Sequence, residues 1–597
     1  MSQVIQHNSV DVVVLGMGTM SGAVAAELTI AGYKVVGIER GPYWDFTSDF
    51  FATKYDEWGI GYMRKFDQPN RVTCPTLRNN RNQFALPVRR STMGQIHSEG
   101  FGVGGACQHY GGLMGRFAPW VYQMRTQTVD RYGLDFLNTV VPHEDITDWP
   151  MTYEEYVPYY EQWEKMWGIC GTDEGPLLPN LTSYQLPPAP STPMALAFKS
   201  AAESLGYHPY PIPHSLASQS FVNSYGVAVN ECLYDGWCAA GCNYVCETGA
   251  KASSAYRSVP AAQKTGNLDL RLNSYVFRLD TDSTGKVTAA RYYDAEGNVH
   301  IQPGKVFFNG LWGYNIVRLM LSSGIGNPYD PVAVTGSLGR GPSLIGTGPT
   351  RAVTGTFSNM GGNAYPAGSG FGGAYGMRDL ADDNFDHTGL DFIGGAFVIF
   401  GRYLGSGPGN LFLGFGTNPT PNMIGSTFKG SLKDTYLPTK TVLRVAPTGM
   451  WPPTTDWFMD LDPHYNDIYG DPVARLTLDY GTNYIKCANN LAPKYAELLT
   501  KMSATNVTTS DPVTTETHAS SWSAHIRGGA RIGTDPTISV FNKWQQCWTS
   551  ENLFAAGEIT EPTGDNTTTG GTHPAGAGSY VAAEGIKKYL ASPGMLV

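Results

Sequence analysis

The stretch DVVVLGMGTMSG, residues 11–22, joins a short apolar run to a glycine-rich turn. The apolar run predicts a buried strand. The next residues, 23–31, have a helix-forming composition and stop before Gly32, which suits a helix C-terminus. Strand, glycine turn and helix in this order predict the first half of a dinucleotide-binding unit.

Each position in the turn has a physical reason in such a unit. Gly16 permits the tight turn, and Gly18 lets backbone N–H groups approach a pyrophosphate. The N-terminus of the following helix adds a partial positive charge. Ser21 occupies the position of the usual third glycine and is followed by Gly22. Serine there departs from the pattern and weakens packing between helix and strand.

An acidic residue follows a second apolar run, residues 34–38. Glu39 lies twenty-one residues after Gly18, where an acid that binds a ribose hydroxyl is expected. A glycine-rich turn formed by chance is the alternative. Strand, helix and acid in register favour the dinucleotide interpretation.

Composition limits the classes of protein that need to be considered. The 597 residues are 42% hydrophobic and 15% charged, which predicts a folded chain of several domains or one large composite enzyme. The net charge of −10 has the wrong sign for neutralising phosphates, so no nucleic-acid partner is expected.

The N-terminal sequence has neither a basic region nor a long apolar run. No stretch reaches the roughly 18 consecutive apolar residues of a membrane span. We therefore expect a protein without a direct membrane span that is cytoplasmic, or periplasmic if it is exported together with a partner that carries a signal.

Flavin and nicotinamide cofactors share this N-terminal pattern, so other segments must distinguish them. A second glycine-rich segment, SEGFGVGGACQH at 98–109, could closely wrap a large planar cofactor. Near the C-terminus, residues 549–558 predict a strand that ends in Gly557 and Glu558. A helix-like stretch, 578–589, follows.

These segments resemble the glucose-methanol-choline family of flavin oxidoreductases, and within it the flavoprotein subunits of gluconate and fructose dehydrogenases. Their common order and spacing make the resemblance specific. The blocks that carry it are GFGVGGACQHYGG (100–112), DWPMTYEEYVPYYEQWE (148–164), DNFDHTGLDFIGG (383–395), HIRGGARIGTDP (525–536) and ENLFAAGE (551–558).

The resemblance implies an α/β fold that binds FAD, with an α+β substrate part. A Rossmann-like FAD-binding domain would be assembled from discontinuous segments, 1–50, 95–135, 225–330 and 537–597. A substrate-binding domain with a mainly antiparallel sheet would comprise 51–94, 136–224 and 331–536. The expected cofactor-binding residues are Gly16, Gly18, Ser21, Gly22, Glu39, Gly104, Gly105, His109, Val276, Gly557 and Glu558.

Two histidines match the catalytic positions of the family. Loss of hydride from an alcohol carbon becomes easier when a base removes the hydroxyl proton, and a neutral histidine suits that task. The resemblance implies that His525 is the base and that His573 orients the substrate oxygen, although the two roles could be exchanged.

His109 has a separate implied role. In the corresponding segment of pyranose oxidases, a histidine at this register is joined covalently to the flavin. Several relatives hold FAD non-covalently with a histidine at the same place. Both states of the cofactor therefore stay open.

Four cysteines lie within fifteen residues, at positions 232, 238, 242 and 246. The spacing of Cys232, Cys238 and Cys242 resembles that of the ligands to a 3Fe-4S cluster in bacterial sugar dehydrogenases of this family. Cys246 is an addition to that pattern. Alternatives are a 4Fe-4S cluster on all four thiolates, zinc, disulfides or free thiols.

Together these features predict an FAD-dependent dehydrogenase that oxidises a secondary alcohol of a sugar, sugar acid or glycoside to a ketone. Electrons would pass to a cytochrome or quinone acceptor, and a small accessory subunit is a possible partner. An oxygen-dependent oxidase and a non-catalytic electron-transfer or binding subunit are the alternatives. A carboxylate substrate would need a positive clamp, for which the candidates are Arg89, Arg90, Arg116, Arg527 and Arg531.

Overall fold

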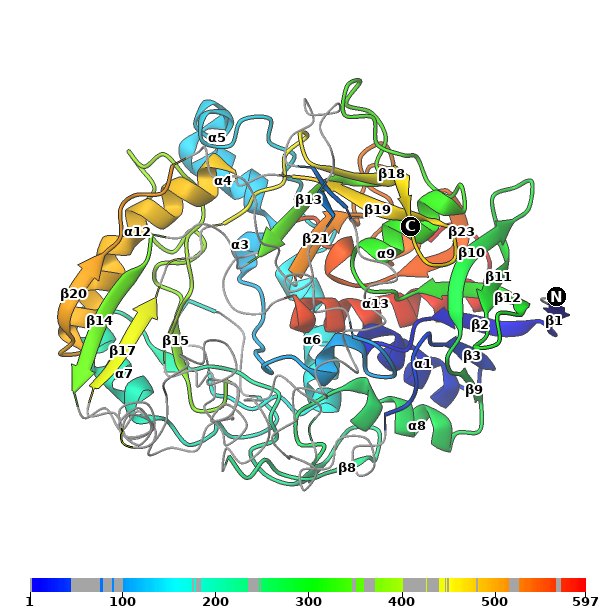
Figure 1. Cartoon of the computed structure of the whole chain (residues 1–597), viewed down its shortest axis with the longest axis horizontal. Coiled ribbons are helices and arrows are strands. Elements are labelled where there is room, and N and C mark those ends of the chain that lie inside the picture. The colour runs from blue at the N-terminus through cyan, green and yellow to red at the C-terminus, as the bar shows by residue number, and fades with distance from the viewer. Residues whose placement is uncertain are drawn as a thin grey trace.

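The structure is a computed structural model, shown in Figure 1. It describes residues 3–44, 76–78, 89–90, 100–173, 177–178, 184–234, 246, 248–345, 351–358, 371–400, 426, 440–445, 447, 450–478, 481–514, 525–564 and 571–596.

A nine-stranded sheet forms the half of the molecule that contains the N-terminus (Figure 1). Its main path runs β10-β11-β12-β2-β3-β9, with β1 and β23 also paired to β12 and β22 paired to β23. The pairs β12·β2, β2·β3, β3·β9 and β12·β23 are parallel, whereas β10, β11 and β12 form an antiparallel meander. The strands are β1 (Val4–Gln6), β2 (Val10–Leu15), β3 (Val35–Ile38), β9 (Leu268–Arg271), β10 (Tyr275–Thr281), β11 (Val287–Tyr293), β12 (Val299–Asn309), β22 (Gln546–Cys547) and β23 (Ser550–Ala555).

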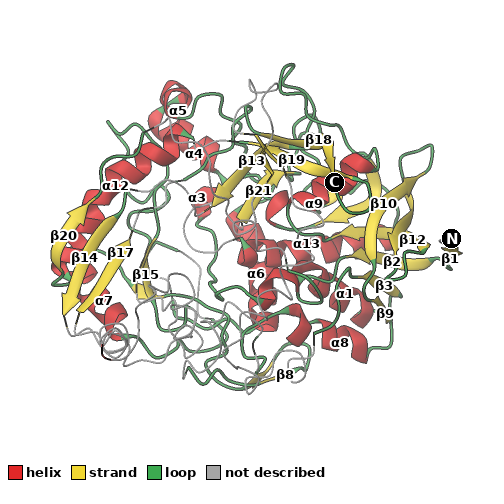
Figure 2. Ribbon diagram, viewed as in Figure 1, coloured by secondary structure: helices red, strands yellow, loops and turns green. Residues whose placement is uncertain are grey.

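Apolar strands in the parallel part of this sheet require cover on both faces. The residues Val12 to Leu15 are fully buried, as the continuous apolar run predicts. Figure 2 shows the helices that pack around the sheet. They are α1 (Thr19–Ile30), α9 (Tyr314–Ser322) and α13 (Thr572–Ala591), and α8 (Val259–Lys264) packs on α1.

A six-stranded sheet lies at the centre of the molecule, in the order β21-β13-β18-β19-β4-β5. All its pairs are antiparallel except β19·β4. This arrangement agrees with the expected mainly antiparallel substrate part. The strands are β4 (Thr76–Arg78), β5 (Arg89–Arg90), β13 (Arg340–Ile345), β18 (Phe458–Asn466), β19 (Pro472–Thr477) and β21 (His525–Gly529).

Smaller sheets complete the described chain. The sheet β17-β14-β20 packs beside α12 and α7 at the end of the molecule opposite β1 (Figure 1). The remaining sheets are β16-β15-β6 and β7-β8. These elements are β6 (Tyr210–Pro211), β7 (Phe221–Val222), β8 (Ala228–Val229), β14 (Val353–Ser358), β15 (Tyr375–Met377), β16 (Val398–Phe400), β17 (Lys440–Val445), β20 (Thr505–Thr509), α7 (Pro193–Ser204) and α12 (Thr482–Lys501).

Helix α6 (Tyr153–Trp167) packs against α13. It begins with a capping box in which Thr152 and Glu155 satisfy each other's backbone N–H groups. The two helices approach closely at Gly576, where an added Cβ would lie 2.3 Å from the Trp163 ring. Preceding α6 are α3 (Pro119–Tyr122), α4 (Met124–Tyr132) and α5 (Leu134–Val140).

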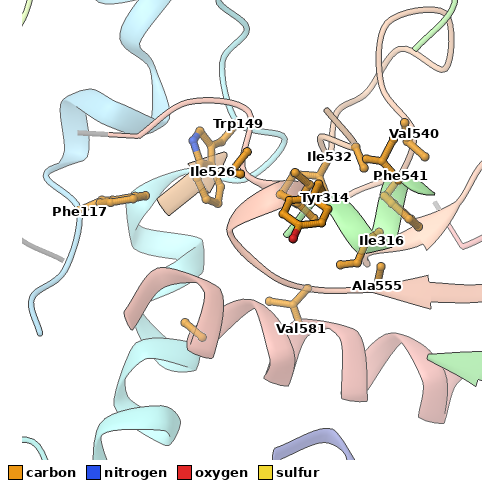
Figure 3. Packing of buried hydrophobic residues seen from close by; sticks show 14 of the residues in the cluster. Phe117, Trp149, Tyr314, Ile316, Ile526, Ile532, Val540, Phe541, Ala555 and Val581 are labelled. Carbon is orange, nitrogen blue, oxygen red and sulfur yellow. The ribbon is translucent and has the colours of Figure 1, made fainter. Parts of the chain in front are cut away.

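One large hydrophobic cluster joins the two main sheets. Figure 3 shows side chains from β23, α13, α9 and β21 in this cluster, among them Ala555, Val581, Ile316 and Ile526. Of the helices within the described ranges, none is both long enough and apolar enough to cross a bilayer.

Candidate active site

A cavity opens at the carboxyl ends of the parallel strands. Gly16 follows β2, Glu39 follows β3, Gly310 follows β12 and Gly557 lies two residues after β23, and all four residues line it. Ligands of open α/β sheets bind at this edge, where strand ends and helix N-termini converge. The sheet therefore places the cavity where the sequence predicts a dinucleotide.

The first glycine turn has the backbone geometry expected for the bound pyrophosphate. Gly16 has a φ of +76°, a left-handed conformation that favours glycine. Gly18 is the N-cap of α1, so the N–H groups of the first helical turn are directed towards the cavity. Among the described residues, apart from Gly18 and its chain neighbours, no atom lies within 4 Å of the place where a Cβ of Gly18 would be.

Glu39 closes this turn with its carboxylate. Its oxygens accept hydrogen bonds from the backbone N–H groups of Met17 (2.8 Å) and Gly41 (2.9 Å). The residue is 5% exposed and lines the cavity. Glu39, the acid predicted to bind a ribose, thus also fixes the backbone of the glycine turn at Met17 and the backbone after β3 at Gly41.

The second glycine-rich segment packs directly against the first. Gly104 donates from its backbone N–H to the Met17 carbonyl (3.0 Å), and both Gly104 and Gly105 have positive φ, +99° and +54°. A Cβ on Gly105 would lie 3.1 Å from the Cα of Gly18. Backbone from the two glycine turns, at Gly16, Gly18 and Gly105, therefore forms one wall of the cavity, which suits a large planar cofactor.

The predicted cofactor-binding residues divide into two groups. Ser21 donates to the Gly310 carbonyl (3.3 Å), and Gly22 packs so closely on Ser254 that a Cβ would lie 2.4 Å from it. Ser21, Gly22, Gly104 and the half-buried His109 lie next to the described cavity wall rather than in it. Those in the wall are Gly16, Gly18, Glu39, Gly105, Val276, Gly557 and Glu558.

Replacement of Gly104 by alanine tests this close packing. A Cβ would lie 2.3 Å from the Ser253 hydroxyl oxygen, and the φ of +99° adds backbone strain. We expect the fraction of purified protein that contains FAD, measured from the absorption spectrum, to fall severalfold. Gly266→Ala is the control, because Gly266 also has a positive φ (+69°) but open space around it. An equal loss of FAD in both variants would contradict the packing explanation.

His525 and Glu558, predicted as base and cofactor-binding acid, are close together. His525 is the first residue of β21, and Glu558 begins a short 3-10 helix, η5 (Glu558–Thr560), after β23. Nδ1 of His525 lies 3.2 Å and 3.3 Å from the two carboxylate oxygens of Glu558. Gly571 makes this possible, since a Cβ there would lie 2.3 Å from Cγ of Glu558.

A carboxylate accepts hydrogen bonds only, so this contact requires the proton of a neutral His525 to be on Nδ1. Nε2 is then the basic nitrogen. The sequence neighbour Ile526 lines the cavity. Glu558 therefore fixes both the orientation and the tautomer of the predicted base, as a carboxylate does in other acid–histidine pairs.

His573 lies in a buried cluster beside the cavity. It is fully buried, accepts a hydrogen bond at Nδ1 from the Gly115 N–H (3.0 Å) and has Nε2 3.1 Å from Glu164. Its neighbour Thr572 lines the cavity. Both ring nitrogens thus contact protein groups, and a direct hydrogen bond to substrate requires one of these contacts to be exchanged.

Glu164 holds this cluster together. Arg116 donates to both of its carboxylate oxygens, from Nε (2.7 Å) and Nη2 (2.9 Å). Burial alone would raise the pKa of Glu164, but hydrogen bonds from Arg116 and His573 lower it below its ordinary value of 4.5. The sequence analysis missed Glu164. The aromatic residues Tyr153, Tyr156, Tyr160, Trp163 and Trp167 mark the buried face of α6, and an acid on that face was the available signal.

Three of the five candidate arginine clamps are engaged by buried acids. Arg116 pairs with Glu164, Arg527 has Nε 3.0 Å from Glu561, and Arg531 has Nη1 3.0 Å from Asp145. These arginines therefore stabilise the fold around the cavity. Arg89 and Arg90 form strand β5, and their side chains lie outside the described residues.

Only the two ends of the cysteine segment are described. Cys232 and Cys246 are half-buried, and Sγ of Cys246 accepts a hydrogen bond from the Lys251 N–H (3.3 Å). Cys238 and Cys242 lie outside the described residues. Across the described part of the chain, no group of three or more His, Cys, Asp or Glu side chains is arranged to hold a metal ion.

Comparison with known proteins shows which proteins share this chain's length and fold. No protein-family model matches it. The chain is 31% identical to a gluconate 2-dehydrogenase flavoprotein from Pantoea cypripedii, over 98% of this chain and 95% of the relative. It is 26% identical to a 2-methyl-1,2-propanediol dehydrogenase from Mycolicibacterium austroafricanum, over 96% and 95% of the two chains.

A solved structure supports the architecture. The crystal structure of a formate oxidase superposes with a TM-score of 0.58, covering 98% of this chain and 99% of that chain at 13% sequence identity. At that identity the likeness establishes the fold alone.

Proposed function

The chain belongs to the glucose-methanol-choline family of FAD-dependent oxidoreductases acting on CH–OH groups, and from this premise we propose that it is a carbohydrate dehydrogenase. Its reaction would convert a secondary alcohol of a sugar, sugar acid or glycoside to a ketone. The observation that carries the proposal is the cavity in which both glycine turns meet Glu558, the residue that contacts His525.

The cavity residues suit FAD. Gly16, Gly18 and the N-terminus of α1 would hold the pyrophosphate, and Glu39 would accept from a ribose hydroxyl. Gly105 in the second turn would lie against the ring system. Bound there, FAD supplies the acceptor for a hydride from the substrate carbon.

His525 is proposed as the general base. Its Nε2 would take the hydroxyl proton as the C–H bond breaks, while Nδ1–H donates to Glu558. The nearby carboxylate stabilises the positive charge that the ring gains. We propose His573 as the second residue of the site, which orients the substrate oxygen after its contact with Glu164 or Gly115 is exchanged.

The substrate class rests on the relatives. One relative is named for gluconate and another for a small diol, which supports a polyhydroxylated or acidic alcohol. Arg116, Arg527 and Arg531 each pair with a buried acid. A carboxylate clamp on a substrate such as gluconate would therefore have to come from Arg89 or Arg90 among the five candidates.

The acceptor is tested by turnover in air. We expect a sugar or sugar acid from a panel to reduce an artificial dye acceptor rapidly, with little hydrogen peroxide formed. Stoichiometric peroxide would make the protein an oxygen-dependent oxidase. Retention of FAD without reduction by any alcohol would favour a non-catalytic subunit.

We further propose that Cys232, Cys238, Cys242 and Cys246 bind an iron–sulfur cluster. Soft thiolates clustered within fifteen residues of the sequence suit iron–sulfur centres. Iron and acid-labile sulfide assays on anaerobically purified protein should find four sulfides per chain, with three irons for a 3Fe-4S cluster or four for a 4Fe-4S cluster. Zinc, or thiol titration that shows disulfides, would refute the cluster.

We propose an electron acceptor, a partner subunit and a cellular location that suit this reaction. Electrons would leave to a cytochrome or quinone, with a small accessory subunit as partner. The protein would be cytoplasmic, or periplasmic if it is exported with that subunit. Full activity of the single purified chain with a quinone would contradict the need for the subunit.

A further inference from the structure

Lys251 is a buried lysine between the cysteine segment and helix α8. It is 2% exposed, and its ammonium group donates to the main-chain oxygens of Gln108 and Tyr110, at 3.1 Å each. Nζ also lies 5.6 Å from the centre of the Tyr110 ring. Burying an ammonium is costly unless it is hydrogen-bonded, so these contacts identify a place where the fold holds a positive charge.

The same residue joins two segments that are far apart in the sequence. Its backbone N–H donates to Sγ of Cys246 (3.3 Å), at the end of the cysteine segment. The Tyr110 hydroxyl donates to the carbonyl of Ala252 (2.9 Å). Cys246, Lys251 and Ala252 are thereby linked to the second glycine-rich segment.

The charge of Lys251 lies close behind the cavity wall. Gly105, Ala106 and Cys107 line the cavity, and the next residue, Gln108, is one of the two acceptors of the ammonium group. Burial raises the pKa of the Cys107 thiol to about 12, while the charge of Lys251 acts in the opposite direction.

We propose that Lys251 is a positioning residue that keeps a fixed positive charge behind this wall and so makes FAD bound in the cavity easier to reduce. The inference rests on the proposed function, because it requires FAD in this cavity. Alcohol oxidation moves two electrons and one proton from the substrate carbon as a hydride, and the hydroxyl proton goes to His525. The transfer leaves one additional negative charge in the cavity, which a buried cation stabilises strongly at low dielectric.

The midpoint potential of bound FAD, measured by equilibration with a redox dye, tests the inference independently of turnover. Lys251→Gln removes the charge but keeps N–H donors for the two carbonyls. We expect the potential of this variant to be more negative than that of the wild type by at least about 30 mV. For a two-electron couple, this shift corresponds to a tenfold increase in the preference for oxidised over reduced FAD. Lys251→Arg keeps the charge and should retain the wild-type potential.

Lys264→Gln is the matched control, because Lys264 is exposed at the end of α8, and it should leave the potential unchanged. A wild-type potential in Lys251→Gln with FAD bound overturns the inference. If Lys251→Gln loses FAD or does not fold, the test is the potential of Lys251→Arg. A shift of that potential from the wild-type value overturns the inference. Failure of the wild-type protein to bind FAD would instead refute the proposed function.

Discussion

Replacement of His525 by alanine should lower kcat for alcohol oxidation by about 10²- to 10⁴-fold, the usual contribution of a general base. The substituted protein should keep its FAD, because the residues proposed to hold the cofactor, Gly16, Gly18 and Glu39, are unchanged. The measurement is dye reduction with the most active sugar of the panel, together with the FAD content of each preparation.

His464→Ala provides the control for this substitution. His464 is an exposed histidine of strand β18 in the six-stranded sheet. It is far from Glu558 in the sequence, and none of its described contacts involves Glu558. Its removal should leave kcat and KM unchanged. Equal activity of the His525 variant and the wild type would remove His525 from the mechanism.

Replacement of Glu164 by glutamine should destabilise the protein by about 3–5 kcal/mol, because Arg116 would remain buried without a compensating charge. The Arg116 and Glu164 side chains are 2% and 5% exposed, so water cannot replace the lost partner. A lower midpoint of urea unfolding at neutral pH would show this effect. The variant tests how α6 and α13 hold the cavity wall near His573.

Glu161→Ala on the same helix is the matched control. Glu161 faces solvent, and its contact with Lys165 joins two exposed side chains (3.8 Å). Surface pairs of this kind contribute about 0–1 kcal/mol, so the unfolding midpoint should hardly change. A comparable loss in both variants would contradict the role given to the buried pair.

The contribution of Glu164 to the free energy of unfolding should depend on pH, and its pKa gives the direction of that dependence. Because its pKa is lower in the folded protein than the ordinary value of 4.5, Glu164 contributes stability at pH values above 4.5. This contribution is lost as the pH falls through the lower, folded-state pKa. The difference in unfolding midpoint between wild type and Glu164→Gln should therefore be full at pH 7 and shrink below pH 4.5. A difference that grew with acidification would contradict this assignment.

The dinucleotide end of the site could be predicted from sequence because its determinants are local. Gly16, Gly18 and Glu39 lie on one strand–helix–strand unit, and a glycine with positive φ or an acid after a strand leaves a clear pattern. The α/β fold with an antiparallel substrate part followed from the family resemblance. Periodicity alone does not show that β12 and β23 join the same sheet as β2.

The supporting residues could not be predicted because they depend on contacts over long sequence separations. Glu164 meets His573 across more than 400 residues, and Lys251 meets Gln108 across 143. The aromatic face of α6 marks Glu164 as a buried acid but does not show its partner, and Lys251 looks like an ordinary surface residue until the tertiary fold buries it. His525 and Glu558 were both singled out, but their contact was not foreseen because it depends on the space that Gly571 leaves.

Anaerobic titration of the purified protein with the sugar panel, followed by visible spectroscopy, tests the central claim most directly. An FAD-dependent carbohydrate dehydrogenase should show flavin absorption that one class of sugar or sugar acid bleaches in a stoichiometric manner. The His525→Ala variant should contain the same flavin and resist bleaching. Protein that remains free of flavin when FAD is supplied, or flavin that no alcohol reduces, would contradict the account.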